Sequence, residues 1–499
     1  MAALAHLDTQ WQWTVRDTAA RFLPRTVLAN EALFERFPRY VLNFEGAHRY
    51  RLLADCHPEL LAVVRRRVEE GRWFPAGAAW EAFDSNLPSP ESLIRQILLG
   101  TREFERLVGR AGRDLLLPDC FGFSRALPSV AVHCGIVGFS TQKLRRGPLM
   151  RSAFGIPFPI GRWVGPDGAE LLSALDPGEY GAQTRTDLAH DADWTRRLAA
   201  QRSAGLPEAL LTYQGLGDQG GAIAARTAAE LEKAASSNGA LEVRIATSEQ
   251  IFLDLAAERS RLPSYEGELL LGLHATGCYT SRAQLKAWHA AAEALAEAAE
   301  RAVALASPFL DAESLRASSA RLRRAWERIL SHQMHDDLTG TSLPAAYRWS
   351  AADLALSMNE LEQELAFAAE RAGEHLAASA EGEALLLFNP LGGEREEVVE
   401  VELPDSGAAR RAPRICTLDG EELPAQWTRH DSAWRGAVLA RAPGLSFSGL
   451  TLREAREAER TSPETPASPG RELENGRYRA LLDERGDLCS LLDREQGIE

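Results

Sequence analysis

The stretch LLLPDCFGFSRALPS, residues 115–129, contains the transition from which the fold can be inferred. Its three leucines predict a buried strand that ends at Pro118, Asp119 follows at once, and Phe121-Gly122-Phe123 then precedes a predicted helix. A strand that ends in a carboxylate and leads into a helix is typical of parallel α/β domains, which bind ligands at the carboxyl ends of their strands. The residues alone leave open the alternative that Asp119 only caps the helix.

The same alternation extends on both sides of this stretch, up to about residue 255. Short apolar runs lie at 2–7, 40–44, 73–79, 115–117, 136–140, 171–175, 209–213 and 242–246. Longer amphipathic segments between them include 59–71, 90–109 and 222–235. This repetition of strand, helix and strand predicts a parallel sheet, either open or closed into a barrel.

The rest of the sequence predicts two further regions. Three long patterns rich in Ala, Leu and Glu predict a three-helix bundle, at 284–305, 313–333 and 351–376. After Glu383, alternating segments such as ALLLFNPLGG predict antiparallel strands, and 478–493 predicts a hairpin after a flexible connection at 459–472. We therefore divide the chain into an α/β domain (1–258), a helical bundle (259–380) and an antiparallel β region that is the start of a β-sandwich (381–499).

The composition limits the classes of function. The 499 residues carry a formal net charge of −15, which argues against a nucleic-acid or anionic-membrane surface, because clustered Lys and Arg bind phosphate groups. Six cysteines without a Cys-x-x-Cys pair fit neither a disulfide framework nor a thiolate zinc site, and they favour a reducing compartment. The sequence has no basic, apolar leader pattern and no run of about eighteen apolar residues. We therefore expect a cytoplasmic protein without nucleic-acid or membrane partners.

Three predicted strands end in a carboxylate. The segment ALAHLD ends in Asp8, RDLLLPD in Asp119 and ALLTYQGLGD in Asp218. Three carboxylates on one face of a sheet repel each other unless a cation or a shared proton relieves the repulsion. His6 adds a neutral nitrogen ligand, and Zn²⁺ accepts a mixture of histidine and carboxylate ligands. A His-x-Asp pair by itself, however, is usually no more than a pair of local hydrogen-bond partners.

The segment YQGLGDQGG supports a competing interpretation. Its Gly215, Gly217 and Gly220 match the Gly-x-Gly-x-x-Gly pattern of dinucleotide-binding folds, and Glu242 lies about where the acidic ribose ligand is expected. This pattern favours a nucleotide-dependent oxidoreductase. Against that function, the motif falls in the last strand-helix unit before the bundle, and a glycine-rich loop that exposes Asp218 explains it equally well.

Two further segments place polar residues at the bundle. QMHDDLTGTS (333–342) supplies His335 and Asp336 where the second bundle helix ends, and by itself it predicts only a histidine that interacts with the helix dipole. LHATGCYTSRAQLK (273–286) puts His274 and Tyr279 where the bundle begins, and a structural use is the default interpretation.

The segment WEAFDSNLPS (80–89) follows another predicted strand. Its Trp80, Glu81 and Asp84 predict either a sugar-facing surface or an ordinary loop surface, and the sequence leaves both open.

Taken together, these segments resemble glycoside hydrolase family 38, the α-mannosidases. Seven matching stretches occur in family order over roughly residues 3–350, among them AHLDTQWQWT, LPDCFGFSRALPSV, GFSTQKLRRG, YQGLGDQGG and HQMHDDLTGTS. The resemblance implies an N-terminal α/β barrel-like catalytic domain, a helical bundle that completes the active site, and a large β-rich region. It also implies an enzyme that hydrolyses terminal α-mannosides of glycans with retention of configuration.

The resemblance assigns roles to particular residues. It implies one divalent cation, most often zinc, held by two histidines and two aspartates: His6, Asp8, Asp119 and His335. Asp119 is then also the nucleophile that forms the glycosyl-enzyme, with a carboxylic acid about 5 Å away. We expect Asp218 to be that acid/base, because a partly desolvated carboxyl group near other negative charge keeps its proton.

The resemblance also implies how the sugar is bound. The cation binds the 2- and 3-hydroxyls, and the axial 2-hydroxyl of mannose favours this bidentate contact. Trp11 matches the aromatic residue that packs against the sugar face, and Asp336 is expected to accept a hydrogen bond from a hydroxyl. The full set of predicted substrate contacts is Trp11, Phe121, Asp336, His274 and Tyr279.

The chain also departs from the family pattern. Family members continue well past residue 499, so we expect the β region to be incomplete, and a truncated, inactive carbohydrate-binding remnant is a third hypothesis. Ala275 stands about where eukaryotic members carry a sugar-stacking tryptophan, so their linkage preference does not transfer. A homo-oligomer is compatible with the sequence.

Overall fold

The structure, a computed structural model, describes residues 1–146, 150–151, 156–184, 186–271, 274–377, 384–404, 413–430, 433–453 and 470–499. The chain divides into two compact units, Met1–Phe367 and Ala368–Glu499. All residues predicted to form the site belong to the first unit. In the described part of the chain, no helix is both long and apolar enough to cross a lipid bilayer.

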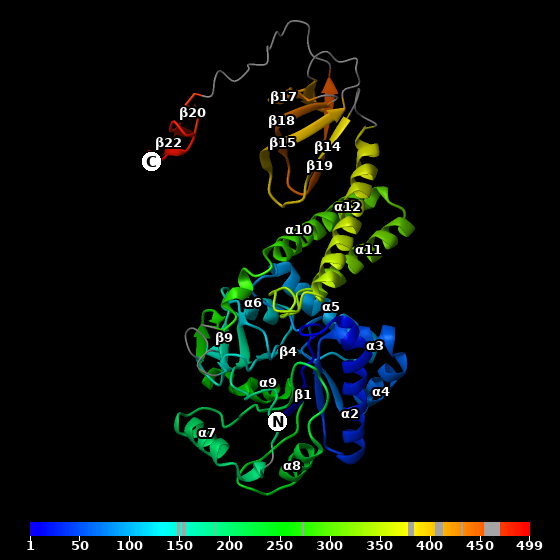
Figure 1. Ribbon diagram of the computed structural model, residues 1–499, viewed down its shortest axis with the longest axis vertical. Coiled ribbons are helices and arrows are strands. Elements are labelled where there is room, and N and C mark those ends of the chain that lie inside the picture. Colours follow the sequence, from blue (N-terminus) through cyan, green and yellow to red (C-terminus); the bar gives the residue numbers. More distant parts are fainter. Residues whose placement is uncertain are drawn as a thin grey trace. The chain divides into compact units, whose positions relative to one another are not determined.

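The first unit is built around a parallel sheet with the strand order β11-β1-β2-β3. Figure 1 labels β1 of this sheet. These strands are β1 (Ala2–Ala5), β2 (Leu42–Glu45), β3 (Trp73–Ala76) and β11 (Tyr213–Leu216). Every residue of β1, β2 and β3 is buried, which explains why they appear in the sequence as continuous apolar runs rather than as alternating patterns.

A second sheet of five strands extends the first, with the order β12-β9-β10-β6-β4. It contains β4 (Asp114–Leu116), β6 (Gly138–Ser140), β9 (Ile160–Val164), β10 (Glu170–Ala174) and β12 (Ser264–Glu266). β4, β6 and β10 are parallel, and only the β9–β10 pair is antiparallel. A hydrogen bond of 2.9 Å from the Gly112 N–H to the Pro75 carbonyl joins the two sheets beside β3. The predicted α/β fold class is confirmed.

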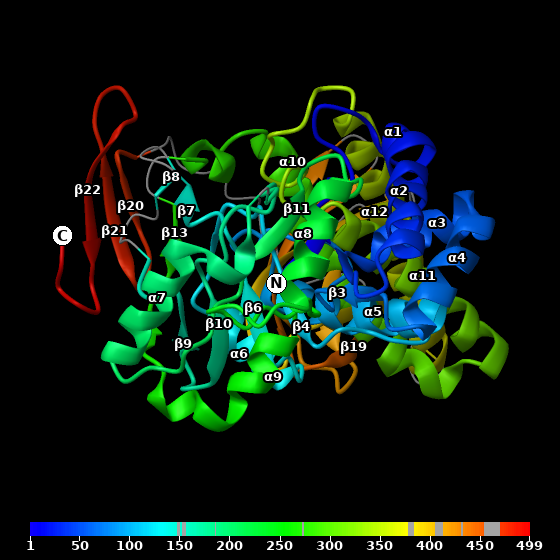
Figure 2. The same ribbon diagram turned by 90° about the horizontal axis from the view of Figure 1, so that it is seen from below.

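Helices cover the parallel sheet. Figure 2 shows α2 (Leu23–Arg36), α3 (Ala47–Cys56) and α4 (Pro58–Glu69) together on one side of it. Ser89 caps the start of the long helix α5 (Pro90–Val108), because its side chain accepts a hydrogen bond from the Ser92 N–H. Gly109, in the left-handed conformation, caps its end. An added Cβ on Gly100 of this helix would lie 2.3 Å from the Ala79 carbonyl carbon, so only glycine permits this close approach.

The three predicted bundle helices are confirmed as α10 (Ala283–Ala306), α11 (Ala312–Ser331) and α12 (Tyr347–Ala377). A row of small buried residues on α10, including Ala292, Ala296 and Ala299, lets neighbouring elements pack closely against it. Arg328 of α11 and Glu360 of α12 form an ion pair of 2.7 Å between the helices.

After the last residues of α12, the described part of the second unit forms small antiparallel sheets, as the sequence predicts. One sheet has the order β14-β19-β16, made of Ala384–Asn389, Ser446–Arg453 and Arg414–Thr417. Another has the order β15-β18-β17, made of Arg395–Pro404, Ala433–Ala442 and Ala425–His430. The hairpin predicted at 478–493 is β21 (Tyr478–Leu482) with β22 (Leu488–Asp493), beside β20 (Glu472–Glu474). The predicted flexible connection at 459–472 lies almost entirely outside the described residues.

Two predicted strands differ in the structure. The run at 209–213 becomes a strand only from Tyr213 onward, because pairing with β1 begins there. The run at 242–246 forms no strand. Its described backbone–backbone bonds are with Met1 alone, whose amino group donates to the Arg244 carbonyl at 2.8 Å and whose carbonyl accepts from the Ala246 N–H at 2.9 Å. Apolar side chains such as Val243 are buried there by packing alone.

Candidate active site and metal centre

The tips of β1 and β11 position three candidate residues: His6, Asp8 and Asp218. Backbone pairing continues past the strand ends, with the His6 N–H 2.9 Å from the Leu216 carbonyl and the Asp8 N–H 2.8 Å from the Asp218 carbonyl. Because extended residues two apart point to the same side, His6 and Asp8 present their side chains together. The local backbone therefore explains the His-x-Asp spacing.

The fourth candidate residue comes from beyond the bundle helix α11. Residues 333–335 run beside 82–84 in a short antiparallel bridge between Phe83 and Met334. The Asp84 N–H donates to the Gln333 carbonyl at 2.8 Å, and the His335 N–H donates to the Ala82 carbonyl at 3.0 Å. This pairing carries His335 to the sheet edge where His6 and Asp8 lie.

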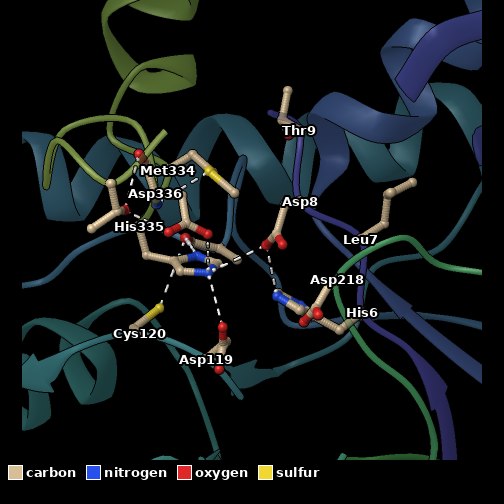
Figure 3. A network of polar contacts seen from close by, with 12 residues as sticks. His6, Leu7, Asp8, Thr9, Asp119, Cys120, Asp218, Met334, His335 and Asp336 are labelled. Carbon is tan, nitrogen blue, oxygen red and sulfur yellow. Dashed lines mark hydrogen bonds and ion pairs between the residues drawn. The ribbon is translucent and has the colours of Figure 1, made fainter. Parts of the chain in front are cut away.

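Figure 3 shows the resulting cluster. The His6 Nε2 lies 2.9 Å from the Asp8 Oδ1, and the His335 Nε2 lies 3.3 Å from the same oxygen. The His335 Nε2 also lies 3.6 Å from the Asp119 Oδ2. All four residues of this cluster are at most 7% exposed, so their charges interact with little screening by solvent. The four are His6, Asp8, Asp119 and His335.

The donor atoms of the cluster suit a metal ion. In the described part of the chain, His6 Nε2, both Asp8 carboxylate oxygens and His335 Nε2 are buried and make no hydrogen bond. Ligand atoms of His6, Asp8 and His335 lie within 4.8 Å of one another, as do those of Asp119, His335 and Asp336. Buried polar atoms normally have partners, so this convergence of orphaned nitrogen and carboxylate donors fits a divalent cation with mixed ligands.

The outer nitrogens of both imidazoles are held in place. The His6 Nδ1 lies 2.7 Å from the Glu45 Oε1, and the His335 Nδ1 lies 2.9 Å from the Ala82 carbonyl oxygen. Both contacts favour the tautomer that carries its proton on Nδ1, which leaves each Nε2 able to bind a cation.

Without a cation, protons compensate the negative charge. Burial opposes a charged imidazolium, but the negative charge of Asp8, 2.9 Å away, and the contact with Glu45 raise the pKa of His6 to about 10. The pKa of His335 is also raised well above its ordinary value, because its negative neighbours outweigh the effect of burial. A cation that binds here must therefore displace protons from the imidazoles.

Asp119 has a partner that the sequence analysis did not single out. The Lys143 Nζ forms an ion pair with the Asp119 Oδ1 and lies 4.9 Å from the centre of the Phe121 ring. Burial acts to raise the pKa of Asp119, yet the charge of Lys143 and the contact with His335 hold it well below the ordinary value. Only three lysines occur in the chain, so Lys143 in the segment GFSTQKLRRG was a detectable signal.

Asp336 lies beside the cluster. Its Oδ2 is 3.5 Å from the His335 Nε2, and its Oδ1 accepts a hydrogen bond of 2.5 Å from the Thr341 hydroxyl. Burial and the negative charge of Asp8 raise the pKa of Asp336 to about 7, although the positive charge of His335 acts the other way. The group can therefore either accept or donate a hydrogen bond near neutral pH.

Asp218 lies on the His6 side of the cluster (Figure 3). Its backbone is left-handed, with a φ of 65°, which is uncommon for a residue other than glycine and often occurs at functional sites. The Tyr180 hydroxyl donates to the Asp218 Oδ1 at 2.7 Å, and the Tyr180 ring lies 5.3 Å from the His6 ring. Asp218 also lines a pocket of about 440 Å³ with Trp11 and Trp13.

The remaining predicted contacts gather around Phe121. Its ring lies 5.7 Å from the His335 ring and 5.5 Å from the His274 ring, both edge-on. The Tyr279 hydroxyl donates to the Phe121 carbonyl at 3.4 Å, and the Tyr279 side chain is partly exposed. The structure thus brings Phe121, His274 and Tyr279 together on the Asp119 side of the cluster.

Glu81 and Asp84 are not loop surface, which was one of the two interpretations of that segment. Glu81 is 1% exposed and contacts His48 Nδ1 at 2.7 Å and Arg49 NH1 at 3.1 Å. Burial acts to raise the pKa of Glu81, but Arg49 and His48 lower it to about 2. Asp84 is buried as well and accepts the N–H groups of the following turn. Both residues brace the backbone that holds His335.

The glycine pattern at 215–220 serves packing between elements. A Cβ on Gly215 would lie 2.3 Å from the Leu4 carbonyl oxygen, and one on Gly217 would lie 1.6 Å from a ring atom of Tyr180. The glycines do not open the next helix, because α8 (Ala225–Ala235) does not begin until five residues after Gly220. In the dinucleotide motif the glycines open the helix whose N-terminus binds the pyrophosphate, so this geometry does not favour a dinucleotide site.

Comparison with known proteins places the chain in a family. Residues 1–268 match the N-terminal domain of glycosyl hydrolases family 38, and residues 273–371 match the α-mannosidase middle domain. The chain is 30% identical to α-mannosidase G of Dictyostelium discoideum over 68% of this chain and 30% of that protein. It is 29% identical to human α-mannosidase 2C1, over 81% of this chain and 37% of that protein.

A solved structure has the same fold. The α-mannosidase from Enterococcus faecalis V583 superposes with a TM-score of 0.76 at 18% identity, covering 99% of this chain and 60% of that one. The chain spans about a third of the length of the Dictyostelium discoideum and human relatives. Because the matched N-terminal domain alone covers more than half of the chain, the protein belongs to family 38 of the glycosyl hydrolases.

Proposed function

We propose that the protein hydrolyses terminal α-mannosides with retention of configuration, at a site whose ligands bind one divalent cation, zinc. One observation carries the proposal: the orphaned donor atoms of His6, Asp8 and His335 converge with the Asp119 carboxylate in a buried cluster. The α-mannosidase names of the relatives support the choice of sugar.

The metal would be held by His6, Asp8, Asp119 and His335, in agreement with the ligand set that the family resemblance implies. When bound, a divalent cation would supply Lewis acidity and would bind neighbouring sugar hydroxyls. Zn²⁺ suits two imidazoles and two carboxylates better than Ca²⁺ or Mg²⁺, which prefer oxygen ligands alone.

Asp119 acts as the nucleophile in this proposal. One carboxylate oxygen forms a bond to the anomeric carbon while the glycosidic C–O bond breaks, which gives a covalent glycosyl-enzyme. Lys143 holds the other oxygen, so the carboxylate is fixed in one orientation before the substrate arrives. Water then attacks the same carbon, and Asp119 leaves as a carboxylate.

Asp218 acts as the acid and the base. It donates a proton to the leaving oxygen in the first step and takes one from the attacking water in the second step. The hydroxyl of Tyr180 holds the Asp218 carboxyl group, and the pocket shared with Trp11 offers an apolar face to a sugar ring. In this proposal Asp336, beside His335, binds a sugar hydroxyl.

The central experiment measures hydrolysis of an aryl α-mannoside by the full chain. We expect activity that is lost on chelation and restored by Zn²⁺. Asp119→Ala should abolish turnover, and added azide should restore product release as a β-mannosyl azide, the inverted product. Asp114→Asn provides a matched control, because it removes a buried carboxylate on β4 that is outside the proposed ligand set. Turnover by chelator-treated enzyme at the normal rate would refute the metal-dependent part of the proposal.

A series of leaving groups tests Asp218. Dinitrophenyl mannosides need no protonation of the leaving oxygen, whereas alkyl mannosides do. Asp218→Ala should therefore cleave the dinitrophenyl substrate to the covalent intermediate at nearly the normal rate and lose most activity on the alkyl substrate. An equal loss on both substrates would contradict the acid/base assignment.

A further inference from the structure

Glu45, the last residue of β2, is a buried carboxylate that the proposed reaction does not use. It is 1% exposed. β1 and β2 pair in parallel with Leu4 opposite Asn43, and His6 and Glu45 each lie two residues further along their strands. The two side chains therefore occupy matching positions on neighbouring strands and point to the same face, where the Glu45 Oε1 lies 2.7 Å from the His6 Nδ1.

The charge of Glu45 is directed at His6. In the described part of the chain, Glu45 Oε2 is buried and makes no hydrogen bond. The neighbouring cation, Arg49, contacts the Glu81 Oε2 at 3.1 Å and the Leu7 carbonyl at 2.5 Å, and it reaches only the backbone oxygen of Glu45, at 3.4 Å. A buried carboxylate is unfavourable unless positive charge lies close to it. For Glu45 that charge is carried by the His6 imidazole itself or by a cation bound to it.

The second imidazole of the site provides an internal comparison. The His335 Nδ1 contacts a neutral backbone carbonyl, that of Ala82, at 2.9 Å. Only His6 is backed by an ionisable carboxyl group. A carboxylate behind a metal-bound imidazole fixes its tautomer and ring orientation and increases the basicity of the nitrogen that faces the cation.

We propose that Glu45 is a positioning residue that holds His6 as the stronger imidazole donor of the metal centre and thereby sets how tightly the divalent cation is retained. The inference rests on the metal site of the proposed function but not on the reaction itself. It adds a third carboxylate, behind the two proposed carboxylate ligands Asp8 and Asp119, and so favours divalent over monovalent cations.

The test measures Zn²⁺ binding without substrate. The full chain is stripped with a chelator and titrated with Zn²⁺ against a chromophoric competitor. Glu45→Gln keeps a hydrogen-bond acceptor but removes the charge, and Glu45→Ala removes both. We expect the Zn²⁺ affinity of the deprotonated site, obtained from titrations at several pH values, to fall about 10-fold for Glu45→Gln and about 100-fold for Glu45→Ala. Asp114→Asn, which changes a buried carboxyl group on β4 that has no contact with His6, should leave the affinity unchanged.

A second readout separates positioning from a general loss of structure. In protein loaded with Co²⁺ alone, the visible absorption bands should move in Glu45→Gln and stay in place in Asp114→Asn. If Glu45→Ala fails to fold, Glu45→Gln still decides the question. Zn²⁺ affinity of Glu45→Gln within twofold of the unmodified protein would overturn the inference, and so would absence of Zn²⁺ binding by the unmodified protein. Failure of mannoside hydrolysis with these affinities as expected would overturn the proposed function alone.

Discussion

Exchange of protons for a metal ion gives a quantitative prediction. In the metal-free site the pKa of His6 is raised to about 10, about three units above neutral pH, because Asp8 and Glu45 outweigh the effect of burial. A ligand nitrogen must be deprotonated to bind Zn²⁺, so the proton on His6 lowers the apparent affinity at pH 7 by about 1,000-fold, or about 4 kcal/mol. The raised pKa of His335 adds a second proton to the exchange.

The assay is a Zn²⁺ titration from about pH 6 to pH 8, with a competing chelator of known protonation behaviour. We expect the apparent association constant to rise at least tenfold per pH unit, since each displaced proton contributes one factor of ten. Calorimetry in two buffers with different ionisation enthalpies should count between one and two protons released. His332→Gln serves as a control, because it removes a buried imidazole outside the ligand set. A pH-independent affinity without proton release would refute the argument.

Three further predictions concern other residues. Lys143→Met should lower kcat/KM about 100-fold by releasing the nucleophile, with partial recovery in Lys143→Arg, and equal rates for both variants and the unmodified protein would contradict this. Asp337 and Asp353 outweigh burial and raise the pKa of His332 to about 9. Its contribution to the free energy of unfolding should therefore be complete below about pH 6.5 and lost as the pH rises through 9. Denaturation experiments should show this loss in the unmodified protein and not in His332→Gln. Gly100→Ala should destabilise the protein by about 3 kcal/mol through backbone clashes, whereas Gly181→Ala, with open space, should change stability by less than about 0.5 kcal/mol in the same denaturation assay.

Much of the fold follows from local patterns in the sequence. Continuous apolar runs predict β1 to β4 because both faces of these strands are buried, and the spacing of Ala, Leu and Glu predicts α10, α11 and α12. The run at 242–246 misled the prediction, because an apolar segment can be buried by packing without joining a sheet. Local hydrophobicity does not report which backbone groups find a partner.

The site was predictable where it depends on strand ends. His6, Asp8 and Asp119 each follow a strand, and the structure brings them to one edge. His335 depends on the pairing of 333–335 with 82–84, a contact between distant segments that no local pattern encodes. Lys143 and Glu45 were missed, although Glu45 ends a strand just as Asp8 follows one, and the same rule applied to every strand end would have found it.

The bridge between Phe83 and Met334 also has a consequence for synthesis of the protein. A ribosome makes Asp119 long before His335, and at about 5–20 residues per second the interval is roughly 10–40 s. During that time the nascent polypeptide holds an incomplete set of the proposed ligands, so in this proposal an ion binds tightly only after residues 333–335 have paired with 82–84. Tight metal binding would thus be a late step of folding. The N-terminal portion expressed alone would release its ion readily.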